Sequence, residues 1–160
     1  MGTNPVRMNS RRTRQRGFIL IAMSVSMLLL LAVLGLAFDL GRVYIARNEA
    51  QVFTDAAAMA AVSKLDETAA GIARAQAAVA HLPGRWNLGT SEFKGVVVEF
   101  SADGTKWESD PKDASGVKLA RVIAPDNNLE ITFLRAVGGP ANLRIAARSA
   151  AAADPPRWIE

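Results

Sequence analysis

The hydrophobic pattern of the chain begins with a long apolar run. The run from Phe18 to Phe38 contains no charged residue, and its only hydroxyl side chains are Ser24 and Ser26. At about 1.5 Å of rise per residue, a helix of this length spans roughly 30 Å, the thickness of the hydrocarbon core of a bilayer. A buried helix of a soluble protein would show a polar face in such a window. We therefore predict a transmembrane helix over residues 18–38.

A cleaved secretory signal is the alternative interpretation of this run. The apolar region of such signals is usually about 7 to 15 residues long, which is shorter than the run seen here. The small residues of Gly35-Leu36-Ala37, just before Phe38, weakly resemble a signal-peptidase site. The length of the run favours an anchor that is retained.

Beyond the run, the sequence continues to favour helix. From Asp39 to His81 it contains no proline and is rich in alanine, the best helix former. An acidic side chain deep in a bilayer costs about 3 kcal/mol, so Asp39 is expected to mark the outer membrane interface, paired with Arg42 three residues later. We predict a helical stalk over residues 39–81. Asp66 either caps a second segment that begins at Glu67 or marks a bend.

Small side chains recur along this stalk at every fourth residue. Such a stripe lets another helix or a sheet approach closely. Good helix formation by alanine is the alternative explanation. Ala37 and Gly41 repeat the spacing nearer the membrane. The stripe consists of Ala46, Ala50, Thr54 and Ala58.

After Leu82-Pro83-Gly84, which should end the helix, the pattern changes to alternation. Asp103-Gly104 is a hairpin signal, and Trp107 beside it is expected to pack in the core. The predicted fold class is therefore α+β: the long helix carries a small antiparallel sheet, residues 82–153, on its outer half, and residues 154–160 form a loose tail. The alternation predicts strands over residues 96–100, 117–123, 129–133 and 142–148.

Charge adds an orientation to this picture. Of the 19 basic and 15 acidic residues, five arginines and no acid lie within residues 1–17, so the rest of the chain is close to neutral. The positive-inside rule then predicts a cytoplasmic tail over residues 1–17, beside the lipid bilayer. No aromatic residue is interleaved with these arginines, which argues against a nucleic-acid partner. The arginines are Arg7, Arg11, Arg12, Arg14 and Arg16.

The sequence offers little for catalysis or metal binding. It contains no cysteine and a single histidine, His81, near a predicted helix end, where a charge interaction is its usual role. A cluster of acids between residues 103 and 113 lacks the spacing of a calcium loop. Ser63, Ser91 and Ser115 lie in no nucleophile elbow. We predict no enzyme activity, no metal and no cofactor. The acids are Asp103, Glu108, Asp110 and Asp113.

Several of these residues together resemble a known family. Arg16-Gly17, the apolar run, the helix exit and the alanine-rich helix have the order and spacing of the TadE/TadG-like proteins of bacterial Tad (Flp) pilus systems. The C-terminal half is similar less sharply, so that the resemblance covers about residues 16–153. The residues that carry it are Asp39, Gly41, Arg42, Tyr44, Gln51, Thr54, Asp55, Ala56, Ala57 and Ala58.

The resemblance implies a pilin-like component of a pilus or secretion machine. It would be anchored by one helix in the bacterial inner membrane, with its domain outside the cytoplasm and other pilus subunits as partners; a homo-oligomer stays open. The sequence contains no Asp-x-Ser-x-Ser motif, which marks the additional metal-binding domain of longer members of that family. A prepilin-peptidase site would need Glu at the fifth position after Gly17, and Ala22 stands there instead of Glu. Cleavage between Gly17 and Phe18 is therefore disfavoured.

Three functions remain in consideration. A stationary assembly factor in the membrane is favoured. A processed minor pseudopilin, incorporated in the filament, is the alternative. A membrane-anchored periplasmic enzyme or ligand-binding module is an alternative of another class, and it would require a pocket with convergent polar groups.

Overall fold

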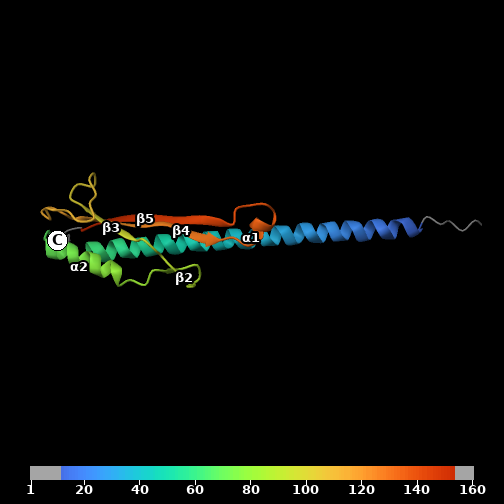
Figure 1. Ribbon diagram of the computed structural model, residues 1–160, viewed down its shortest axis with the longest axis horizontal. Coiled ribbons are helices and arrows are strands. Elements are labelled where there is room, and N and C mark those ends of the chain that lie inside the picture. The colour runs from blue at the N-terminus through green and yellow to red at the C-terminus, as the bar shows by residue number, and fades with distance from the viewer. Residues whose placement is uncertain (1–11, 154–160) are drawn as a thin grey trace, which may run out of the picture.

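A computed structural model describes residues 12–153, and its dominant element is one very long helix (Figure 1). This helix, α1 (Arg12–Val62), is 51 residues long. Its portion Gly17–Val62 is, within the described residues, the one helix long and apolar enough to cross a membrane. Of the predicted basic tail, Arg7 and Arg11 lie outside the described residues, as does the predicted C-terminal tail with Trp158. The backbone of Arg12, Arg14 and Arg16 is already helical.

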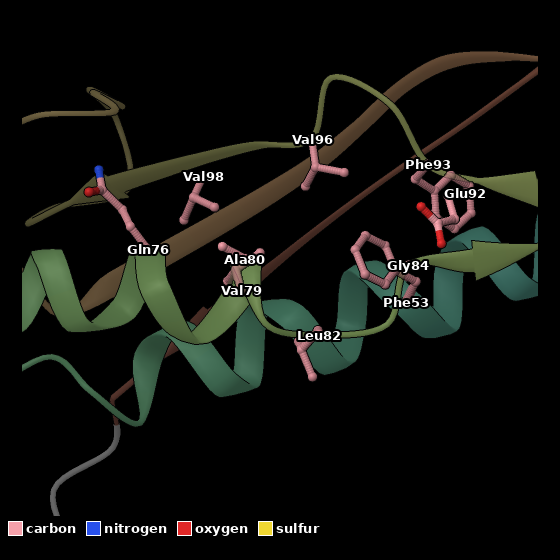
Figure 2. A pocket seen from close by; sticks show the side chains of 10 residues that line it. All are labelled: Phe53, Gln76, Val79, Ala80, Leu82, Gly84, Glu92, Phe93, Val96 and Val98. Atoms are coloured by element: carbon pink, nitrogen blue, oxygen red, sulfur yellow. The ribbon is translucent and has the colours of Figure 1, made fainter.

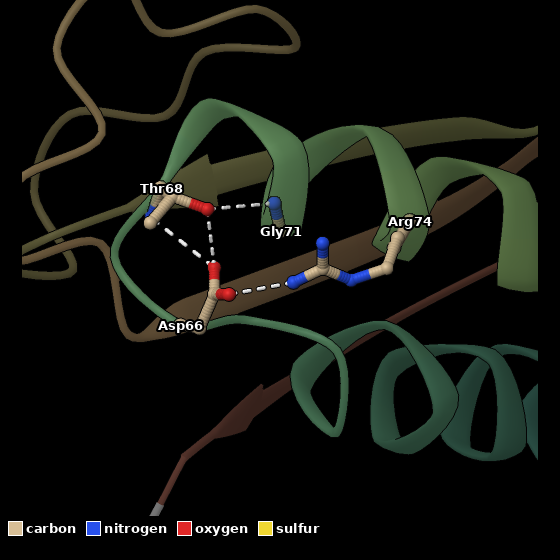
Figure 3. Close-up of polar contacts among 4 residues, drawn as sticks. All are labelled: Asp66, Thr68, Gly71 and Arg74. Carbon is tan, nitrogen blue, oxygen red and sulfur yellow. Dashed lines mark hydrogen bonds and ion pairs between the residues drawn. The ribbon is translucent and has the colours of Figure 1, made fainter.

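A second helix, α2 (Ala69–Ala80), folds back beside α1, so residues 63–68 make a connection and not a bend. The predicted cap was Asp66, but the N-cap is Thr68, whose Oγ1 accepts the Gly71 N–H at 3.0 Å. Asp66 instead accepts from the Thr68 hydroxyl at 2.6 Å and pairs with Arg74 at 2.6 Å (Figure 3). A Cβ added at Gly71 would lie 2.1 Å from Asp66 Oδ1, so only glycine fits beside this arrangement.

The strands form a three-stranded antiparallel sheet and a separate short hairpin. The sheet has the order β3-β4-β5, with β3 at Val97–Ser101, β4 at Leu119–Glu130 and β5 at Asn142–Ala152. The hairpin pairs β1 (Arg85–Trp86) with β2 (Ser91–Glu92). The long helix with its small antiparallel sheet confirms the predicted α+β class.

The prediction of two strands over residues 117–123 and 129–133 was wrong, because the chain forms one long strand there. Ala124 pairs with Ala147 and Asn127 with Ile145, which leaves one extra residue on β4. This is a β-bulge at Pro125, whose missing N–H cannot take part in a regular ladder. Beyond β4, Phe133 belongs to a short helix, α3 (Phe133–Ala136), and not to a strand.

At the predicted hairpin, Asp103-Gly104 forms a turn, but the chain after the turn pairs with β3 at one residue only and makes no second strand. Phe100 and Glu108 exchange backbone hydrogen bonds of 2.8 and 3.1 Å. Trp107 does not pack in the core as predicted. It is only partly buried, and the Arg121 guanidinium lies 4.4 Å from the centre of its ring. The tryptophan of the core is Trp86, which is 3% exposed.

Two clusters of buried apolar side chains follow one another along α1. The cluster nearer the apolar run, called here the span-side core, is built around Leu129 and Ile145 of the sheet and Trp86 of the hairpin. The second, called the far core, joins α1 and α2 to Phe100 and Val122. On α1 itself, both cores contain mostly alanine.

Candidate functional site: the contact between the long helix and the sheet

The face that α1 turns toward the sheet consists of small residues. Ala46, Ala50 and Thr54 are 0% exposed, and Ala58 is 1% exposed. Because these side chains are short, the larger side chains of the sheet approach the helix backbone closely. The four-residue stripe seen in the sequence thus lies against the protein's own sheet.

A polar network joins the middle of α1 to Ser149 on β5. Gln51 Nε2 donates to Ser149 Oγ at 3.0 Å, and the Thr54 hydroxyl lies 2.9 Å from the same atom. The Ser149 hydroxyl in turn donates to Asp55. Gln51 Nε2 also donates to Asp55 Oδ1 at 3.0 Å. Because its own hydroxyl is hydrogen-bonded, buried Thr54 carries little desolvation cost.

A second polar contact lies where the apolar run ends. Asp39 is 2% exposed, and its carboxylate accepts the backbone N–H groups of three consecutive residues. The distances from Thr132, Phe133 and Leu134 are 3.3, 2.8 and 2.6 Å. The predicted pairing of Asp39 with Arg42 is replaced by these backbone contacts. Hydrogen bonds from several N–H groups stabilise a carboxylate that is taken out of water.

Arg42 and Glu49 on α1 hold the β1–β2 hairpin. Arg42 donates to the Glu130 carbonyl and to Asn87 Oδ1, each at 3.2 Å. Glu49 accepts the Leu88 N–H at 3.1 Å. Asn87 and Leu88 both have positive φ, at 53° and 59°, and contacts from α1 maintain this strained turn.

The remaining motif residues lie on other faces of α1. Ala57 is buried in the far core, whereas Ala56 is exposed. Tyr44 is 76% exposed, and a Cβ added at Gly41 would meet nothing within 4 Å. The motif therefore divides between residues that hold the sheet and residues that face outward.

Some residues of this contact could not be found from the sequence. Ser149 stands in a run of alanines, and only its inward place in the strand alternation marks it. Asn87 carries no signal, because its role depends on Arg42, which lies 45 residues earlier. In the sequence, Gly35-Leu36-Ala37 weakly resembles a signal-peptidase site. In the fold, Gly35 is a packing site. A Cβ there would lie 2.8 Å from the Phe133 side chain.

The structure also contains a pocket between α1, α2 and the sheet, of about 360 Å³ (Figure 2). Its lining is mainly apolar, and its polar side chains Gln76 and Glu92 lie at opposite ends of the view. Gln76 is already bonded to the Ser109 carbonyl at 2.8 Å. A small-molecule site needs polar groups that converge on one point, which this pocket does not offer.

Two of the loop acids, Asp103 and Asp113, bind the backbone of their own loops. Asp103 accepts the Thr105 N–H at 2.8 Å and the Thr105 hydroxyl at 2.6 Å, which together hold its pKa far below the usual range. The Ser115 N–H, 2.9 Å from Asp113, likewise lowers the pKa of Asp113. Within the described residues, no group of three or more His, Asp or Glu side chains is placed to hold a metal ion. His81 is the C-cap of α2.

Comparison with known proteins identifies the first part of the chain. Residues 17–77 match the family model described as "Putative Flp pilus-assembly TadE/G-like". The match covers the apolar run, the part of α1 that follows it and most of α2, and it ends before the sheet. It confirms the family to which the motif residues point, and it indicates a part in Flp pilus assembly. A search of curated proteins and a search of solved structures gave no match.

Proposed function

We propose, on the premise that residues 17–77 are TadE/G-like, that this protein is a non-catalytic, stationary component of a Tad-type (Flp) pilus machine. In this proposal, residues 18–38 span the bacterial inner membrane once, and residues 1–17 lie in the cytoplasm. A stalk over residues 39–81 and a β-rich domain over residues 82–153 lie outside, followed by the tail at 154–160. The five arginines near the N-terminus support this orientation.

The observation that carries the proposal is the continuity of α1 from the apolar run into the sheet contact. No linker separates the two parts, because Asp39, the first residue after the run, already binds the loop at residues 132–134. The outer domain is thereby fixed to the helix that would cross the membrane. Such a rigid connection suits an anchor that holds an assembly domain at a constant height.

The outward face of α1 supports contact with another pilus subunit or a second copy. Leu40, Tyr44, Val52 and Met59 are each more than half exposed on this face, with fractions of 58, 76, 58 and 63%. Apolar side chains on an exposed helix are typical of helix-to-helix interfaces. The same face favours the second candidate, a processed pseudopilin packed in a filament, since it continues the apolar surface of the run. The Ala22 position argues against processing and therefore against this candidate.

The intact mass of the protein purified from membranes tests the proposal. We expect the uncut chain, because Ala22 stands where processed relatives carry Glu. A mass that begins at Phe18 would overturn the stationary anchor and support a filament subunit. The variant Ala22→Glu, expressed with the prepilin peptidase, is the control that shows whether cleavage at Gly17 would be detected.

A further inference from the structure

The α3 segment lies beside the apolar run. The Phe133 side chain packs against Gly35, and its ring meets Phe38 edge to face at 5.7 Å and 82°. In Figure 1, the orange segment between β4 and β5 extends farther toward the blue end of α1 than the rest of the sheet does. The loop around α3 therefore overlaps the last four residues of the run, Gly35 to Phe38.

This loop presents apolar side chains outward. Phe133 is 46% exposed and Val137 is 68% exposed. On the adjacent turn of α1, Phe38, whose ring meets that of Phe133, is 56% exposed. These side chains continue the apolar surface of the run on the same side of the molecule, and in water they would form an exposed apolar patch.

The backbone of the loop is unusually well satisfied for an irregular segment. Asp39 accepts the N–H groups of residues 132–134. The Ile131 N–H donates to the Ala141 carbonyl at 2.9 Å, and those of residues 137–139 donate to carbonyls of residues 134 and 135 at 2.8 to 3.2 Å. Non-helical backbone is tolerated near a membrane only when its polar groups are bonded within the protein.

The length of the run points the same way. If the loop stayed in water, only residues 18–34 would remain for the bilayer, a helix of about 26 Å, which is shorter than the hydrocarbon core of about 30 Å. With the loop in the membrane interface, the whole run to Phe38 can lie at hydrocarbon depth.

We propose that residues 133–138 insert into the outer boundary between acyl chains and headgroups, so that the protein contacts the bilayer through this wedge as well as through its span. The occupant of the apolar patch is therefore lipid. Exposed Arg135, on the same turn, reaches the headgroup phosphates, while Phe133 and Val137 enter the acyl boundary. The proposal rests on the membrane anchoring proposed above.

Spin labelling tests the wedge, because a chain without cysteine accepts a unique label. Val137→Cys carries the test label, and Ala136→Cys serves as a second position on the same exposed turn. Leu28→Cys, in the middle of the run, tests the anchoring. Leu88→Cys, 66% exposed on the β1–β2 turn, is the aqueous control. Each labelled protein is reconstituted in phosphatidylcholine and phosphatidylglycerol vesicles, and collisions with oxygen and with a water-soluble nickel chelate are measured.

We expect the nickel-to-oxygen collision ratio at Val137 to be on the order of threefold lower than at Leu88, as for a side chain several ångströms inside the interface. Ala136 should follow Val137. Equal ratios at Val137, Ala136 and Leu88, with the Leu28 label deep in the bilayer, would overturn the wedge and leave the anchoring intact. An aqueous ratio at Leu28 would overturn the anchoring and the wedge with it.

Discussion

Alanine on α1 and larger apolar residues on the sheet form complementary surfaces. Ala46 and Ala50, both 0% exposed, belong to the same core as Leu129 and Ile145. The alanines contribute little apolar area themselves, and most of the buried area comes from the sheet side chains they admit. A change at one of these positions therefore affects the contact of the whole sheet with the helix.

The variant Ala50→Glu tests this at a single residue. It would place an unpaired carboxylate between α1 and the sheet, and we expect a loss of about 3–5 kcal/mol in the free energy of unfolding. Thermal unfolding of the protein in detergent, followed by circular dichroism, measures the loss. Ala56→Glu, at an exposed position of the same helix, should leave the unfolding temperature nearly unchanged. Similar unfolding temperatures for the two variants would contradict the packing described.

At this scale, the sequence predicts residues whose partners lie on the same element better than residues with distant partners. The small stripe is visible because a helix repeats every 3.6 residues. The end of the run at Asp39 is equally visible, but its carboxylate binds N–H groups that lie more than 90 residues away. Local spacing pointed to Arg42 instead. The role of Ser149 depends in the same way on the folded contact.

Among the elements, α2 begins with one short polar arrangement, in which Asp66 and Thr68 of the connection from α1 bind Gly71 and Arg74 of α2. The Thr68 hydroxyl, and after it the Arg74 guanidinium, hold the pKa of Asp66 below its usual value of 3.8. A carboxylate whose pKa is lower in the folded state stabilises the fold above its unfolded-state pKa. Its contribution is lost as the pH falls through the folded-state pKa.

We therefore expect the unfolding temperature to be nearly constant from pH 7 to about 5 and to fall below about pH 4. Asp103 and Asp113 contribute in the same direction, since their pKa values are also lowered. Asp66→Asn should unfold at a lower temperature at pH 7 and lose less than the wild type on acidification. Asp110→Asn, at an exposed loop position, is the control. Parallel pH curves for wild type and Asp66→Asn would rule out this role for Asp66.

The elements themselves were predictable where one pattern runs through them. The apolar run, the alanine-rich helix and the alternation near Phe100 and Ile145 each indicate the right element. The bulge at Pro125 was not predictable, because proline between two alternating segments usually marks a turn. The helical turn at Phe133 was also missed, since the alternation of Leu129 and Ile131 continues through it. Its N–H groups depend on Asp39, which no local pattern supplies.

Across the whole molecule, the two cores lie in series along α1. The Ser149 network and the β-bulge lie between the span-side core and the far core, and the Asp39 contact closes the arrangement at the apolar run. Stability in such an arrangement need not be uniform, because each core can open separately.

We expect Asp39→Ala to loosen the span-side core alone. Three N–H groups would lose their acceptor, at a cost on the order of 3 kcal/mol. Hydrogen exchange measured by mass spectrometry should then accelerate around Leu129 and Ile145 and stay unchanged around Phe100 and Val122. Asp39→Asn keeps an oxygen acceptor and should show a smaller effect. Uniform acceleration in both regions would indicate that the cores open together.

The unbroken course of α1 couples the direction in which the sheet faces to the rotation of the helix in the bilayer. Each residue turns a helix by about 100° and lifts it by about 1.5 Å. One alanine inserted beside Leu28 would thus swing the outer domain about a quarter turn around the helix axis at almost constant height. Seven inserted residues would return it to within about 20° of its first heading, about 10 Å farther out. The direction in which the outer domain faces and its distance from the membrane can therefore be varied almost independently. A subunit that contacts the span inside the membrane thereby also determines which side of the sheet its neighbours encounter.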